Sequence, residues 1–76
     1  MNNYKIKDIV TINIQEVINN NARLDIDPES FFIITDIFKN GDMMYHIKNI
    51  KTNEKVFIRK NEEYAFIEEE LNIVKP

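Results

Sequence analysis

Hydrophobic and polar residues alternate along much of the chain, and this alternation predicts a protein built mainly from β-strands. In residues 8–14, Val10, Ile12 and Ile14 alternate with polar residues, which is the two-residue period of a strand with one buried face. Aromatic and β-branched residues, which favour strands, are concentrated in the runs that follow. The same criteria predict further strands at residues 30–38, 43–49, 55–60 and 71–74.

The period of two also predicts which side chains of the third and fourth strands face the core. Side chains at every second position of a strand share one face of the sheet. The predicted inward residues are Tyr45, Ile47, Val56 and Ile58, and the predicted outward residues are His46, Lys48, Phe57 and Arg59.

Turn signals separate these runs. Asn40-Gly41 lies between two apolar runs and predicts a hairpin, and residues 50–54 predict a second turn. Residues 15–30 contain three consecutive asparagines and Asp27-Pro28, which predict a long loop. A short helix over residues 14–19 is the alternative at the start of this loop.

Residues 61–70 admit two interpretations. Asn61 can begin a short helix that places Tyr64, Ile67 and Leu71 on one face, with carboxylates in its first turn. Alternatively, residues 63–67 form a strand that a single 3₁₀ turn follows. The helix is the favoured interpretation.

Length and composition exclude several classes of protein. With 76 residues, the chain forms a single domain over residues 1–76. It has no cysteine and one histidine, which argues against disulfides, thiolate chemistry and a metal centre built on cysteine or histidine. No nucleophile motif surrounds the one serine. We therefore expect a protein that is not an enzyme and that uses no cofactor or metal.

The chain also lacks the sequence signals of export and membrane insertion. No apolar run approaches the roughly 20 residues that a membrane helix needs. Residues 1–7 are polar and contain no apolar signal core. These features predict a cytoplasmic protein that does not insert into a membrane.

Residues 4–12, Tyr-Lys-Ile-Lys-Asp-Ile-Val-Thr-Ile, resemble the opening of bacterial SH3-like small barrels. Those barrels open with an aromatic residue, an aliphatic residue and Gly-Asp before an alternating strand; here Lys7 stands where glycine is usual. The runs within residues 31–60 and the ending over residues 70–74 are similar to the same architecture. The resemblance implies a mainly β, five-stranded SH3-like barrel with one short helical turn near residues 61–70.

The similarity is to the short barrels of phages and mobile elements and to KOW- and Tudor-like modules. It is a similarity of fold, which does not define a function. The proline-peptide-binding SH3 domains differ, because they use a tryptophan and an Ala-Leu-Tyr-Asp-Tyr type of segment. This chain has neither, so polyproline binding is not expected.

Charge is unevenly distributed along a chain whose formal net charge is −3. Residues 43–60 contain five lysine or arginine residues and one glutamate, which gives +4. Residues 61–76 contain five glutamates and one lysine, which gives −4. The third and fourth strands are therefore expected to form a basic hairpin in an acidic protein.

This hairpin is the candidate partner-binding surface. Basic residues around an exposed aromatic can contact an acidic protein surface, or can stack bases and neutralise phosphates. The plain alternative is a solvated sheet face on which Phe57 packs against lysine stems. The candidate residues are His46, Lys48, Phe57, Arg59 and Lys60.

The glutamates near the C-terminus form a candidate acidic surface. Such a surface can mimic the phosphate charge that a partner's basic groove recognises, or it can simply balance a helix dipole and keep the protein in solution. The candidate residues are Glu62, Glu63, Glu68, Glu69 and Glu70.

The sequence thus predicts a non-enzymatic protein-interaction module. The resemblance suggests one encoded by a phage or mobile element that modulates or inhibits a host or defence protein. The alternative is a small nucleic-acid-binding module that uses the basic hairpin, with weak affinity because basic residues are few. The oligomeric state stays open, since edge strands can pair between copies.

Overall fold

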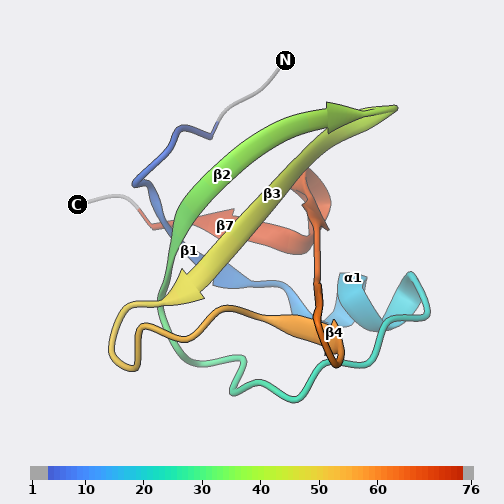
Figure 1. The fold of residues 1–76 in the computed structure, drawn as a ribbon, viewed down its shortest axis with the longest axis horizontal. Coiled ribbons are helices and arrows are strands. Elements are labelled where there is room, and N and C mark those ends of the chain that lie inside the picture. Colours follow the sequence, from blue (N-terminus) through green and yellow to red (C-terminus); the bar gives the residue numbers. More distant parts are fainter. Residues whose placement is uncertain (1–3, 75–76) are drawn as a thin grey trace.

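The computed structural model describes residues 4–74 (Figure 1). Residues 1–3, part of the stretch predicted not to be a signal peptide, lie outside the described residues, as do residues 75–76. The fold is mainly β, as predicted. In chain order its elements are β1 (Ile9–Ile12), α1 (Ile14–Asn19), β2 (Phe32–Asn40), β3 (Asp42–Asn49), β4 (Phe57–Arg59), β5 (Glu62–Glu63), β6 (Phe66–Ile67), the 3₁₀ turn η1 (Glu68–Glu70) and β7 (Leu71–Ile73).

Seven strands form two antiparallel sheets within the described residues. The larger sheet has the strand order β6-β3-β2-β1-β7, and β4 pairs with β5 in a small second sheet. The two edge strands of the larger sheet, β6 and β7, are joined in the chain only by the three residues of η1. A 3₁₀ helix rises about 2 Å per residue, so this short connection requires the sheet to curl. The bend of β2 and β3 is visible in Figure 1.

The buried core confirms most of the predicted alternation. Tyr45, Ile47 and Val56 are buried, and Ile58 is partly buried against the core. Phe57 is 48% exposed, and Arg59 is also exposed. The buried apolar residues are Tyr4, Val10, Ile12, Val17, Ala22, Phe32, Ile34, Tyr45, Ile47, Val56, Phe66 and Leu71.

The predicted hairpin joins β2 to β3. Asn40 pairs with Asp42 across it, and Gly41 adopts φ +77°, a left-handed conformation that glycine accepts without strain. Asparagine serves a similar role in the predicted turn at residues 50–54, where Asn53 has φ +64°. There the Asn49 Oδ1 accepts from the backbone N–H groups of Lys51 (2.8 Å) and Thr52 (3.0 Å).

The alternative of a short helix over residues 14–19 is confirmed by α1. Asn13 caps the helix, because its Oδ1 accepts from the Glu16 N–H at 3.4 Å. Val17 is the buried residue of this helix. After α1 the chain follows the predicted loop without further helix or strand until β2 begins.

The favoured helix beginning at Asn61 is wrong, and the strand-and-turn alternative is closer to the structure. Asn61 has φ +65° and lies in the turn between β4 and β5, so it does not cap a helix. Phe66 is fully buried, although a helix that buried Tyr64 and Ile67 would have turned Phe66 away. Within residues 61–70 only η1 is helical.

The predicted pairing of the third and fourth strands is confirmed only where it begins, beside the turn at residues 50–54. The only bridge between those two segments joins Lys48 and Lys55, and β4 then leaves the large sheet to pair with β5. The Val56 carbonyl accepts from the Tyr64 N–H at 2.8 Å, which extends this second pairing. His46 and Lys48 therefore lie on the large sheet, and Arg59 lies on the small one.

Lys7 has φ +78°, a conformation that glycine adopts more readily. For a side-chain-bearing residue this conformation costs roughly 1–2 kcal/mol, while glycine adds an entropic cost of about 0.5–1 kcal/mol. We expect Lys7→Gly to raise the free energy of unfolding by about 0.5 kcal/mol, as the balance of these two effects. Urea denaturation measures the change. The matched control, Lys39→Gly within β2, should lower stability, and equal changes in both variants would contradict the prediction.

Candidate functional site

The structure brings the predicted basic residues together only in part, and carboxylates lie among them. His46 Nδ1 is 3.7 Å from a carboxylate oxygen of Asp36 and 3.7 Å from one of Glu63. The ring of His46 also packs against Phe38, with centroids 5.0 Å apart. His46 is therefore partly buried between neighbours of this chain and is not the open basic residue that we predicted.

The other predicted basic positions are dispersed. Arg59 Nη1 pairs with Glu62 Oε1 at 3.1 Å, so its charge has a partner on the same hairpin. Lys48 is partly buried on β3, and Lys60 is exposed in the turn after β4. Phe57 lies opposite Glu63 in the β4–β5 pair. Acidic side chains thus lie among the residues of the basic hairpin that the sequence predicts.

Four of the five glutamates in the predicted acidic surface are at least partly exposed, and the fifth is buried. Glu62 and Glu69 are exposed, and Glu63 and Glu68 are partly exposed. Glu70 is only 1% exposed, so its assignment to the surface is wrong. Its position as the last residue of η1 directs the carboxylate inward, where hydrogen-bond donors surround it.

Glu70 is a structural carboxylate shared by three parts of the chain. It accepts hydrogen bonds from the Tyr64 hydroxyl (2.7 Å), from the Asn20 side-chain amide (3.1 Å) and from the Ile67 N–H (3.0 Å). Burial, together with the hydrogen bond to Glu70 and its charge, raises the pKa of Tyr64. Through Asn20, the C-cap residue of α1, Glu70 connects the end of that helix to η1.

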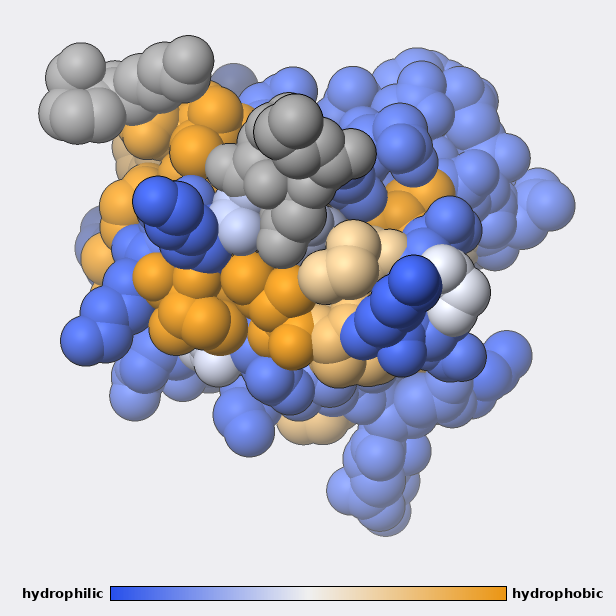
Figure 2. Space-filling model, turned by 90° about the horizontal axis from the view of Figure 1, so that it is seen from above, coloured by the Kyte–Doolittle hydropathy of each residue, from blue (hydrophilic) through white to orange (hydrophobic). Residues whose placement is uncertain are grey.

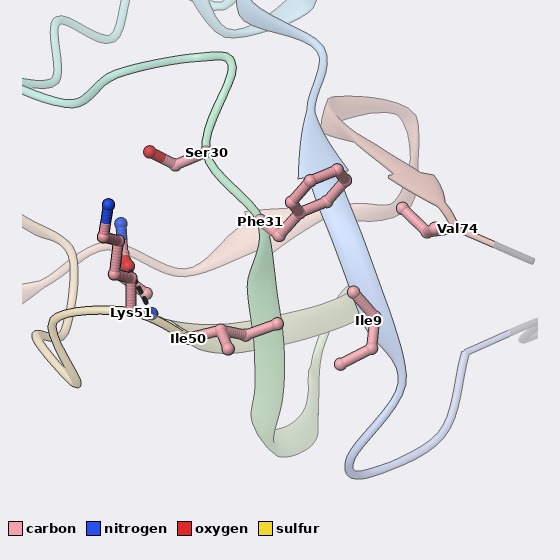
Figure 3. Close-up of a pocket in the computed structure, with 7 residues that line it drawn as sticks. Ile9, Ser30, Phe31, Ile50, Lys51 and Val74 are labelled. Carbon is pink, nitrogen blue, oxygen red and sulfur yellow. Dashed lines mark hydrogen bonds between the residues drawn. The ribbon is translucent and has the colours of Figure 1, made fainter.

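A surface pocket that the sequence analysis did not predict lies where the ends of β1, β3 and β7 meet the start of β2 (Figure 3). Its volume is about 470 Å³. Most of its wall is hydrophobic, and only three lining residues are polar or charged. The lining residues, called the apolar pocket below, are Ile9, Ser30, Phe31, Asn49, Ile50, Lys51 and Val74.

Large hydrophobic side chains remain exposed to solvent at this pocket. Phe31 is 53% exposed and Ile50 is 48% exposed. In Figure 3 the side chain of Ile50 extends toward Ile9, and the side chain of Phe31 extends from the start of β2 toward β1. One face of the molecule, shown in Figure 2, carries a band of hydrophobic side chains among hydrophilic ones.

Backbone hydrogen bonds hold the pocket wall in place. The Ile50 N–H donates to the Phe31 carbonyl at 3.1 Å, and the Val74 N–H donates to the Ile9 carbonyl at 2.9 Å. These bonds join residues that are distant in sequence. The backbone that forms the wall of the pocket is therefore fixed within the folded chain.

The sequence contained a signal for this surface. Residues 31–34 are all apolar, so a strand there must carry apolar side chains on both faces. Phe32 and Ile34 take the buried face, which leaves Phe31 to the outer one. The sequence alone does not predict that Val74 lines the pocket, because its position depends on the pairing of β1 with β7.

Comparisons with known protein families, with curated proteins and with solved structures find no match to this chain. Over residues 4–74, no cluster of three or more histidine, aspartate or glutamate side chains is arranged to hold a metal ion. None of the helices in that range has the length and hydrophobicity required to span a membrane.

Proposed function

We propose that this protein is a non-catalytic protein-interaction module and that it binds its partner through the apolar pocket. The observation that carries this proposal is the exposure of Phe31 and Ile50 in a preformed, mostly hydrophobic depression. Exposed apolar surface is costly in water, and contiguous patches of it commonly mark protein contacts. A large aromatic side chain such as Phe31 is also a typical source of interface binding energy.

We further propose that the scaffold is an SH3-like small barrel. The pairing of β1 with the last strand β7 supports this assignment, as does the position of η1 immediately before β7. The three-residue link between the two edge strands also favours a barrel, because it brings the edges of the curled sheet close together. On such a scaffold the pocket lies on the outside of the barrel.

Selection of a random displayed-peptide library on the immobilised protein tests the proposed function. We expect bound peptides whose affinity falls at least about tenfold in Phe31→Ser, since truncation of a central aromatic costs more than about 1.4 kcal/mol. Isothermal titration calorimetry measures this ratio. The matched control is Phe57→Ser, which removes a similarly exposed phenylalanine outside the pocket and should change affinity less than about twofold.

The opposite ranking of the two variants, or the absence of any selected peptide, would reject the pocket as the binding site. Nucleic-acid binding is the competing outcome, and it has less support because Glu62 and Glu63 accompany Arg59 and His46. Fluorescence polarisation with short DNA and RNA distinguishes it. Salt-sensitive micromolar binding that Lys48→Glu removes would replace the proposed function with nucleic-acid recognition.

A further inference from the structure

We infer that the partner segment bound by the apolar pocket is acidic: it places a large hydrophobic side chain in the pocket and a carboxylate beside Lys51. This inference rests on the proposed function and adds the chemistry of the partner. It follows from the polar groups at the pocket edge and from the charges around them.

The polar groups that line the pocket are mainly hydrogen-bond donors. Asn49 Oδ1 is already occupied by two backbone N–H groups of its own turn, at 2.8 and 3.0 Å, so the side-chain amide retains chiefly its donor capacity. The Lys51 ammonium offers three donors and no acceptor. Only the Ser30 hydroxyl can either donate or accept. A ligand that matches this edge must therefore bring acceptors.

Lys51 lacks an internal counter-charge. Among residues 4–74, no carboxylate lies within ion-pair distance of its ammonium group. Lys48 and Lys55, which face each other across the bridge that precedes β4, likewise form no ion pair in that range. Glu54 is the one acidic residue between positions 48 and 55, against three lysines, so this segment of the pocket edge is positive; Asp8 and Glu29 adjoin the lining residues Ile9 and Ser30 on other segments.

If a purely hydrophobic segment docked in the pocket, no negative charge would replace the water that the Lys51 ammonium group loses. A partner that covers the pocket also removes water from Lys51, and an ammonium group loses hydration energy unless an opposite charge replaces the water. A carboxylate a few residues from the hydrophobic anchor provides that charge. It also gives electrostatic selectivity over basic segments.

The test is peptide-library selection on the wild-type protein and on Lys51→Glu, followed by calorimetry. We expect wild-type selection to enrich aspartate or glutamate within about three residues of a large hydrophobic residue. Lys51→Glu should bind those peptides at least about tenfold more weakly and should instead enrich lysine or arginine. Lys39→Glu, the matched control, makes the same change in net charge in β2, away from the pocket, and should keep the wild-type preference.

Each other outcome has a distinct meaning. Peptides that depend on Phe31 but show no acidic preference would overturn this inference and leave the proposed function standing. Peptides that are insensitive to Phe31→Ser would overturn both. A concentration-dependent dimer in analytical ultracentrifugation that Phe31→Ser abolishes would identify a second copy of the chain as the occupant, and would also overturn the inference.

Discussion

Replacing Glu70 with alanine should remove most of the stability of this domain. The substitution leaves the partly buried donors of Tyr64 and Ile67, and the exposed side-chain amide of Asn20, without their common acceptor. Each buried group left unpaired costs roughly 1–3 kcal/mol. We expect a loss of about 3–5 kcal/mol in the free energy of unfolding, chiefly from the unpaired Tyr64 hydroxyl and Ile67 N–H, against a total near the lower end of the usual 5–15 kcal/mol for so small a domain.

Urea denaturation followed by circular dichroism measures the loss. The matched control is Glu69→Ala, which removes an exposed carboxylate from the preceding position of η1 and should change stability by less than about 0.5 kcal/mol. Glu70→Gln retains one acceptor oxygen, so its loss of stability should lie between those of Glu69→Ala and Glu70→Ala. Similar stabilities of the Glu69 and Glu70 alanine variants would show that the buried hydrogen bonds have no net stabilising effect.

The sequence predicted well the features that neighbouring residues determine. The alternation that placed Tyr45, Ile47 and Val56 inward is a local consequence of strand geometry, and all three are buried. The hairpin at Gly41 follows from the conformations that Asn-Gly tolerates, and is likewise local. In both cases the information lies within a few residues of the feature it predicts.

The features that sequence reasoning missed depend on distant pairings. One of the three donors around the buried Glu70 carboxylate is the side chain of Asn20, fifty positions earlier, and no local pattern indicates that contact. The period of two identifies the faces of β4 but not its neighbour, so it could not distinguish pairing with β3 from pairing with β5. The apolar pocket likewise exists because four separated segments meet at one end of the sheet.

The three tyrosines of the chain should make its stability fall steeply at alkaline pH. Burial is the main cause that raises the pKa of Tyr4, Tyr45 and Tyr64 above 10.0; nearby Glu68 adds to the effect at the first two, and Glu70 at the third. The folded state therefore holds three phenol protons that the unfolded state releases near pH 10. This stabilisation is fully present below pH 10 and is lost as the pH rises from 10 through the raised values of the folded protein.

A combined titration by phenolate absorbance and circular dichroism tests this prediction. We expect little phenolate at pH 10, and then ionisation of all three tyrosines together with loss of the β-sheet signal. Tyr64→Phe removes one of the three titrating groups, so the decrease of the unfolding free energy per pH unit should become about one third shallower. Tyr64→Phe also removes the hydrogen bond to Glu70. The loss of that bond lowers the free energy of unfolding by a similar amount at every pH, so it does not change the slope of the free energy against pH. A gradual rise of phenolate through pH 10 in a protein that stays folded would mean that the hydroxyl groups are open to water, contrary to the packing of Tyr45 and Tyr64 in this structure.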